Sequence, residues 1–133
     1  MAEKAIRAIL VGDGAVNALV SGRVYARTLP QNPKLPAVVY SRISGTRVES
    51  LQGASGLASP RFQIDVFAER YDEVKTLTRD IQLALEGKRG SFGGVDVQGI
   101  LYQGDRDMTD DLTDNLTIDQ HRVMMEFTIW HRE

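Results

Sequence analysis

The chain has 133 residues, of which 42% are hydrophobic and 26% charged, with a formal net charge of −2 and no cysteine. This composition predicts one globular domain, residues 1–133, whose core needs no metal or disulfide. The lack of thiols excludes disulfides, thiolate metal sites and cysteine nucleophiles, and the near-neutral charge gives no general attraction to nucleic acid or to an anionic membrane. No apolar run has the length of a membrane span, so we expect a protein that is in the cytoplasm when made.

Two short helices are predicted at the start of the chain. Apolar residues recur at helical spacing over residues 2–11, with charged residues on the other side. Asp13 then follows in a Gly-Asp-Gly interruption and is well placed to cap a second short helix. Gly22 comes after the last apolar residue of that helix and is a suitable stop.

Extended segments are predicted next. Residues 23–27 form a short strand, and residues 28–36 hold three of the four prolines, which lack a strand's backbone donor and therefore predict a loop. Residues 37–43 are β-branched and apolar, and residues 61–67 alternate apolar and polar side chains, so both are predicted strands that pair antiparallel. Between them, the small, glycine-rich residues 50–60 predict a flexible loop or the tip of a long hairpin.

The clearest helix is predicted over residues 71–86, where apolar side chains form one stripe and Gly87 follows. Val95, Val97 and Leu101 then alternate in a further strand. Gly99 lies inside this strand and is a candidate site for a β-bulge.

The last part of the chain begins with residues 105–119, which hold six aspartates and one arginine and predict a mobile acidic loop. Apolar residues at every second position from 123 to 129 then predict a terminal strand with a central or ring-closing place in the sheet. The predicted order of elements is ααβββαββ. Because helices and strands are segregated and short links join most strands, this order favours an α+β fold with an antiparallel sheet of four to five strands and helices packed on one side.

Motifs for nucleotide or metal binding are incomplete. The segment Gly-Asp-Gly at residues 12–14 begins like a dinucleotide loop, but Asn17 stands where the third glycine belongs. A calcium loop that starts at Asp105 would have Asp110 in place of its turn glycine and Leu116 in place of its bidentate glutamate. We therefore predict a solvated acidic loop or a patch that meets a basic partner.

Pairs of titratable residues also fail as catalytic or metal sites. His121 and His131 are ten residues apart in one strand, about 30 Å at roughly 3.3 Å per residue, and cannot share a metal. Asp65 and Glu126 alternate with core positions, as the solvent-facing residues of a half-exposed sheet do, rather than forming an acid–base pair. The sequence therefore predicts no catalytic, cofactor-binding or metal-binding residue and a protein that is not an enzyme.

Several segments together resemble the tail completion, or tail terminator, proteins of long-tailed phages and their prophage relatives. They are AIRAIL at residues 5–10, LPAVVY at residues 35–40, GLASPRFQIDVFA at residues 56–68 and HRVMMEFTIWHRE at residues 121–133. The similarity runs in order over nearly the whole chain, while residues 105–119 offer little pattern to compare.

This resemblance implies a structural protein in the phage tail. The family has an α+β fold in which helices pack on a curved sheet, and it has no catalytic residues. Its members form rings, typically hexamers, that end the growth of the tail tube and join the tail to the head connector. The implied partners are further copies of the chain, the tail tube protein and the head–tail connector protein, and the implied location is the virion tail.

Candidate interface residues follow from the predicted loops and the last strand. Each loop carries apolar residues on an otherwise polar segment, and Trp130 lies on the outer side of the terminal strand, where it marks either an interface or a contact with the first helices. The predicted interface residues are Leu29, Leu35, Leu51, Leu57 and Trp130. The alternative is a small binding or regulatory domain that uses the acidic loop or the sheet face for a ligand.

Overall fold

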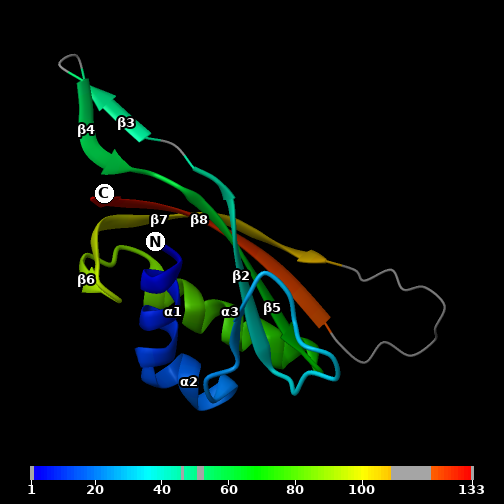
Figure 1. Ribbon diagram of the computed structural model, residues 1–133. Coiled ribbons are helices and arrows are strands. Elements are labelled where there is room, and N and C mark those ends of the chain that lie inside the picture. The colour runs from blue at the N-terminus through cyan, green and yellow to red at the C-terminus, as the bar shows by residue number, and fades with distance from the viewer. Residues whose placement is uncertain (1, 46, 51–52, 109–120, 133) are drawn as a thin grey trace.

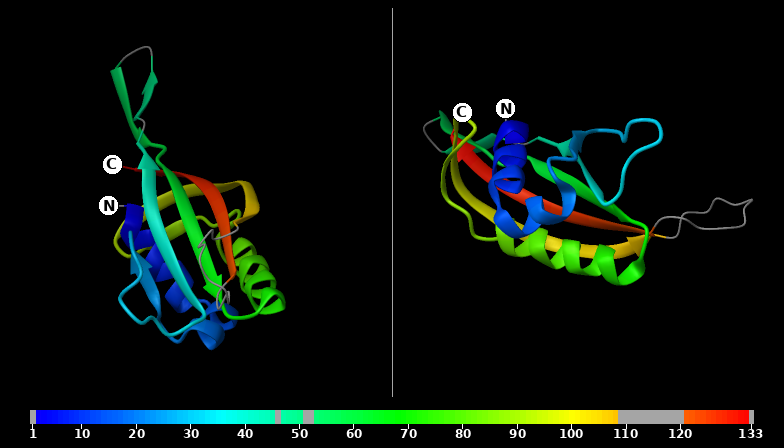
Figure 2. Two further views of the ribbon diagram at one scale, coloured as in Figure 1. Left: turned by 90° about the vertical axis from the view of Figure 1, so that its right-hand side faces the viewer. Right: turned by 90° about the horizontal axis from the view of Figure 1, so that it is seen from below.

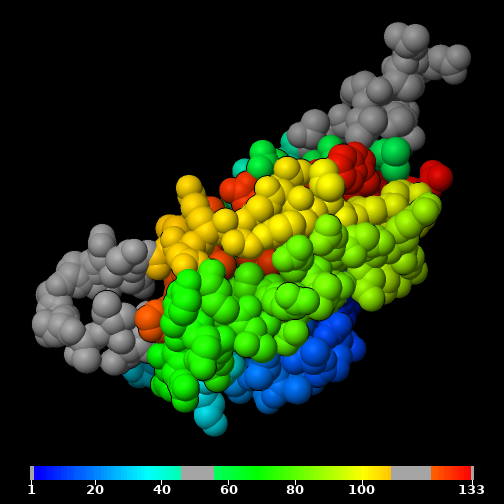
Figure 3. Space-filling model, turned by 180° about the vertical axis from the view of Figure 1, so that it is seen from behind, coloured from blue at the N-terminus to red at the C-terminus, as the bar shows by residue number. Residues whose placement is uncertain are grey.

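The computed structural model describes residues 2–45, 47–50, 53–108 and 121–132, and three helices in these ranges lie against one face of a curled β-sheet (Figures 1 and 2). The helices are α1 (Ala2–Gly12), α2 (Gly14–Val20) and α3 (Tyr71–Leu85). From behind, α3 lies alongside β7, with α1 and α2 beyond it (Figure 3). The predicted α+β class and the curved sheet with helices on one side are confirmed.

The sheet has eight strands among the described residues, rather than four to five. The strands are β1 (Val24–Ala26), β2 (Ala37–Ser44), β3 (Arg47–Ser50), β4 (Gly53–Ala58), β5 (Arg61–Ala68), β6 (Gly90–Phe92), β7 (Val95–Met108) and β8 (His121–Arg132). Their order is β1-β2-β5-β8-β4-β3, with β7 beside β8 and β6 beside β7. The last strand, β8, therefore has the central place that the sequence predicted.

The segment between β2 and β5 is a hairpin of β3 and β4 that extends away from the helices (Figure 1), in agreement with the second of the two predicted alternatives, the tip of a long hairpin. Of the described residues of β4, Leu57 and Ala58 pair with β8 and so join the hairpin to the sheet. One part of the sheet differs from the prediction. The first strand, β1, pairs with β2 in parallel, whereas the predicted sheet was antiparallel throughout. The predicted pairing of residues 37–43 with residues 61–67 is confirmed as β2 with β5.

The two N-terminal helices form as their sequence predicts. The Asp13 carboxylate accepts hydrogen bonds of 3.1 Å from the backbone amides of Ala15 and Val16 and so caps the start of α2. The helix ends at Val20 and is capped by Ser21, whose φ of 47° is left-handed, and Gly22 continues the turn with a φ of 78°.

The core lies between the helices and the sheet. Along β8, every second side chain from Val123 to Ile129 is fully buried on the helix face, and Phe62, Ile64 and Val66 of β5 meet them there. The apolar stripe of α3 covers this layer, because Val74, Leu77, Ile81, Ala84 and Leu85 are all buried.

A bulge in β7 changes which of its residues enter the core. The register against β8 shifts between Val97 and Gly99, so one extra residue is inserted and the alternation moves by one position. As a result Ile100 is buried at 5% exposure, while Leu101 is 48% exposed. The predicted alternation of Val95, Val97 and Leu101 thus holds for its first two members, and the bulge proposed at Gly99 turns the third outward.

The end of β7 is tied to the first turn of α3. Asp107 accepts 2.6 Å hydrogen bonds from the Lys75 ammonium and from the Tyr71 hydroxyl. These bonds, the one from Lys75 most of all, hold the pKa of Asp107 below its ordinary value, and the same bond raises the pKa of Lys75. Asp105 to Met108 therefore belong to a strand, although the sequence predicted a loop from Asp105 onward; residues 109–120 lie outside the described residues.

Replacing Phe127 with alanine should remove a fully buried ring from the centre of the core. We expect the free energy of unfolding to fall by about 3–5 kcal/mol, because the cavity adds to the lost transfer energy. Leu83→Ala is the matched control, since Leu83 is 66% exposed and should change stability by less than about 0.5 kcal/mol. Urea denaturation measures both, and equal effects of the two substitutions would contradict this placement of the core.

Replacing Asp107 with asparagine should lower stability slightly at neutral pH. A carboxylate whose pKa is depressed in the folded state stabilises that state above its unfolded pKa, near 3.8, and loses this contribution as the pH falls through the folded value. Because the Asp107 and Lys75 side chains are nearly half exposed, we expect the substitution to lower the free energy of unfolding by no more than about 0.5 kcal/mol at pH 7. Denaturation at pH 7 and at pH 3 should show this difference shrinking in acid; a difference that grows in acid would contradict the assignment.

Candidate functional site

The face of the sheet away from the helices, here called the open face, carries the side chains that alternate with the core. Opposed residues of paired strands share a face, so Asp65 lies beside Met124, and Gln63 beside Glu126, on this side. Trp130 and Arg132 continue the same alternation along β8. Trp130 is thus on the open face, away from α1 and α2, so the predicted contact with the first helices is wrong, and its place in an interface stays a prediction.

Three apolar residues from three strands form a line across the open face, here called the apolar row: Leu57, Trp130 and Leu101. Leu57 pairs with Arg132, so it is a diagonal neighbour of Trp130 on the same face. On the other side Gly99 pairs with Trp130 and Leu101 with Thr128, which makes Leu101 the second diagonal neighbour of Trp130. A Cβ at Gly99 would meet no atom within 4 Å, so there is open space beside the row.

The predicted interface residues are brought together only in part. Leu57 and Trp130, which the sequence singled out separately, become neighbours at the base of the β3–β4 hairpin. Leu29 and Leu35 are half-buried in the loop before β2, at the opposite end of the sheet, and Leu51 lies outside the described residues. Leu101, the third member of the apolar row, was not among the predicted interface residues, although the glycine that turns it outward was visible in the sequence.

The open face also carries two ion pairs that involve the two carboxylates weighed as an acid–base pair. Asp65 is 5% exposed and accepts hydrogen bonds of 3.2 and 3.1 Å from the Nε and Nη2 atoms of Arg122, whose guanidinium lies 5.5 Å from the centre of the Phe67 ring. Glu126 binds Arg61 at 2.5 Å. Each carboxylate is held by a different arginine, and both ion pairs link β5 to β8.

The two histidines lie near opposite ends of β8. The His121 ring meets the Tyr71 ring edge-on with 5.7 Å between their centres, and the Nδ1 atom of the buried His131 is 2.9 Å from the backbone oxygen of Arg132. In the part of the chain that the structure describes, no three His, Asp or Glu side chains gather as metal ligands do.

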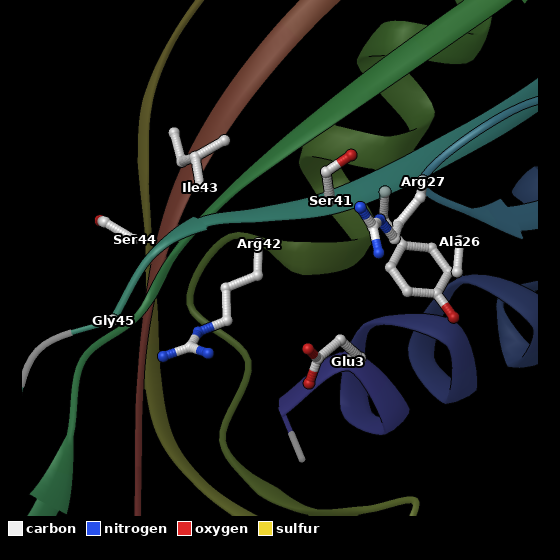
Figure 4. Close-up of a pocket in the computed structure, with 9 residues that line it drawn as sticks. Glu3, Ala26, Arg27, Ser41, Arg42, Ile43, Ser44 and Gly45 are labelled. Atoms are coloured by element: carbon white, nitrogen blue, oxygen red, sulfur yellow. The ribbon is translucent and has the colours of Figure 1, made fainter.

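An open cleft of about 500 Å³, here called the arginine cleft, lies between the first turn of α1 and the end of β2. Arg27, Arg42 and Glu3 project into the same space from three different elements (Figure 4). Arg27 follows β1 with a φ of 73°, an uncommon conformation for a residue with a side chain. No sequence motif indicates this cleft, because its lining residues come from segments that are separated along the chain.

Among the helices that the structure describes, none combines the length and apolar character needed to cross a bilayer.

Comparison with known proteins gives a family match over nearly the whole chain. The model of the family described as tail completion protein gp17 matches residues 4–132. A search of curated proteins found no match.

Two solved structures are similar in fold. A protein in the virion of a native gene transfer agent particle is 18% identical, with a TM-score of 0.78, and the similarity covers 97% of this chain and 92% of that one. A second structure, which has no descriptive name, is 14% identical with a TM-score of 0.54, and the similarity covers 100% of this chain and 96% of that one. At these identities, both similarities concern the fold.

Proposed function

The chain belongs to the tail completion protein gp17 family, and from this premise we propose that it forms a ring that caps the tail tube of a phage and joins the tail to the head connector. Membership makes it a structural protein of a phage tail rather than an enzyme. The family match over residues 4–132 is the observation that carries the proposal.

The geometry of the open face supports an assembly role. The apolar row is exposed or half-buried, and it lies at the base of a hairpin that extends from the body of the protein (Figures 1 and 2). A two-stranded hairpin is marginally stable in water without further contacts, so a hairpin attached through two residue pairs gains stability when a partner covers it. We propose that the hairpin and the apolar row together contact another protein of the tail.

A ring also needs a second contact surface. Copies in a ring meet through two different patches on each subunit, because the contacts are heterologous. The loop before β2 contributes Leu29 and Leu35 at the far end of the sheet from the apolar row, and we keep it, together with Leu51, as a proposed contact. The proposed partners are further copies of the chain, six in all by analogy with the family, the tail tube protein and the head–tail connector protein. In this proposal the chain meets them first in the host cytoplasm.

Replacing Leu101 with glutamine should weaken assembly without unfolding the protein. Leu101 is 48% exposed, so we expect the free energy of unfolding to change by less than about 1 kcal/mol. Loss of its contact in an interface should weaken binding to tail tubes by about tenfold, which corresponds to about 1.4 kcal/mol. Co-sedimentation with purified tubes and the yield of joined particles measure the effect.

Leu83→Gln is the matched control, because Leu83 is an equally apolar and more exposed residue on α3, on the other side of the molecule. This control variant should bind tail tubes and support the joining of particles as the unaltered protein does. If both substitutions weaken joining equally, or if neither does, the apolar row is not the contact surface. If the unaltered protein neither binds tail tubes nor supports joining, the proposed function itself is wrong.

A further inference from the structure

We propose that the arginine cleft is the site where an extended acidic segment of another tail protein adds a strand to the edge of β2. The inference rests on the proposed function, because it names how a partner in the assembly is held. It is carried by the place where β1 leaves the edge of the sheet, and by the charges that line the cleft beyond that place.

The outer edge of β2 has a neighbouring strand along only part of its length. β1 pairs with β2 up to the register of Ala26 with Tyr40, and the Arg27 amide then donates a 2.9 Å hydrogen bond to the Tyr40 oxygen. After Arg27, whose φ of 73° is left-handed, the chain leaves this edge for the loop before β2. β2 itself continues to Ser44, so among the described strands none pairs with its outer edge beyond Tyr40.

The backbone of Arg42 points toward this free edge, because alternate residues of a strand direct their amide and carbonyl groups to the same side. The Val38 amide donates to the backbone oxygen of Arg23, just before β1. The Tyr40 oxygen accepts from Arg27, just after β1, so both residues of β2 face that strand. Two residues later, the amide and carbonyl of Arg42 face the place that β1 has left. The edge beyond Tyr40 is thus a template for one more strand, over four residues of β2 or about 13 Å at roughly 3.3 Å per residue.

The arginine cleft lies along this free edge. Every residue of the chain from Tyr40 to Gly45 lines it, and Glu3 joins them from the first turn of α1. Ala26 and Arg27 lie at one end of the space and Gly45 lies at the other (Figure 4). Because the cleft has the direction of the edge, a segment bound in it would run beside β2 as a strand does.

The charges of the lining favour an acidic segment. Arg27 and Arg42 line the cleft together with Glu3, and Arg42 interacts electrostatically with Glu3. The described lining therefore has an excess of one positive charge, and a planar guanidinium can hold a carboxylate with two parallel hydrogen bonds. A segment that carries lysine or arginine would instead meet like charge.

A second copy of the chain is a poor source of this segment. The longest described connection outside the helices and strands, residues 27–36, carries Arg27 and Lys34 and no carboxylate. The occupant that fits the charge of the cleft is therefore a segment of a different protein. Strand addition of this kind takes its affinity from backbone hydrogen bonds and its specificity from side-chain contacts, which the arginines supply here.

Amide hydrogen exchange tests the added strand directly. In the full-length chain, exchange at the Arg42 amide is compared between the free protein, the protein bound to purified tail tubes and the protein in joined particles. We expect exchange at Arg42 to slow by about tenfold or more in at least one of the two assemblies, because the amide acquires a hydrogen bond there. Unchanged exchange at Arg42 in assemblies that form normally would overturn the proposal.

Two substitutions at Arg42 separate the backbone contact from the charge. Arg42→Gln removes the charge and keeps the amide, whereas Arg42→Pro also removes the amide, and an edge strand tolerates proline where its amide points outward. We expect the glutamine variant to assemble about threefold more weakly and the proline variant about tenfold more weakly or worse. Equal assembly of the two variants would mean that the backbone edge is not used. Urea denaturation checks that both variants fold; if the proline variant does not, the exchange measurement decides.

Arg27→Glu tests the charge of the occupant. We expect this reversal to weaken assembly by about tenfold and to reduce its dependence on salt, because salt screens the attraction that the variant has lost. Arg79→Glu is the matched control, because Arg79 is exposed on α3, outside the cleft, and its reversal should leave both properties unchanged. Unchanged assembly of the Arg27 variant would contradict an acidic occupant.

The same measurements distinguish this inference from the proposed function. Exchange at Arg42 that slows in the isolated chain as its concentration rises would identify a second copy as the occupant and overturn the choice of partner. Normal assembly of the unaltered protein with free exchange at Arg42 would count against the added strand alone. Failure of the unaltered protein to bind tail tubes or to support joining would count against the proposed function itself.

Discussion

The position of β8 is the constraint on which the rest of this structure depends. Its backbone pairs with β5 and β4 on one side and with β7 on the other, so it sets the register of the whole central sheet. Its alternate side chains are divided strictly between the buried core and the open face. A shift of one residue would send Phe127 and Ile129 to the open face and the charged residues of β8 into the core, so a slipped sheet is strongly disfavoured.

The regular parts of the fold could be predicted from the sequence because each has a local cause. Apolar spacing specified α1 and α3, the Asp13 side chain specified the start of α2, and strict alternation specified β5 and β8. A short strand was predicted over residues 23–27, and the tip of a long hairpin was one of two alternatives for residues 50–60. The parallel pairing of β1 and the strands β3 and β4 themselves could not be predicted in the same way, because their small and mixed side chains carry little periodicity. They form through pairing with strands that are distant in sequence.

The candidate site was predictable only in its separate parts. Leu57 and Trp130 were identified one by one as exposed apolar residues, but their proximity depends on the pairing of β4 with β8. Leu101 joins them because of a single inserted residue at the Gly99 bulge, which reverses the direction of every later side chain in that part of β7. The arginine cleft depends on three elements at once, and no pattern within one of them signals it.

The ion pair between Asp65 and Arg122 has an evolutionary consequence. Asp65 is almost fully buried, so losing Arg122 would leave its negative charge without a cation, with the Gln63 amide as its remaining hydrogen-bond donor among the described side chains. Removing one member of such a pair typically costs about 3–5 kcal/mol, whereas replacing both with apolar residues of similar volume can be neutral. Among descendants of this chain, the two positions should therefore change together, so that this pair is inherited as a single unit.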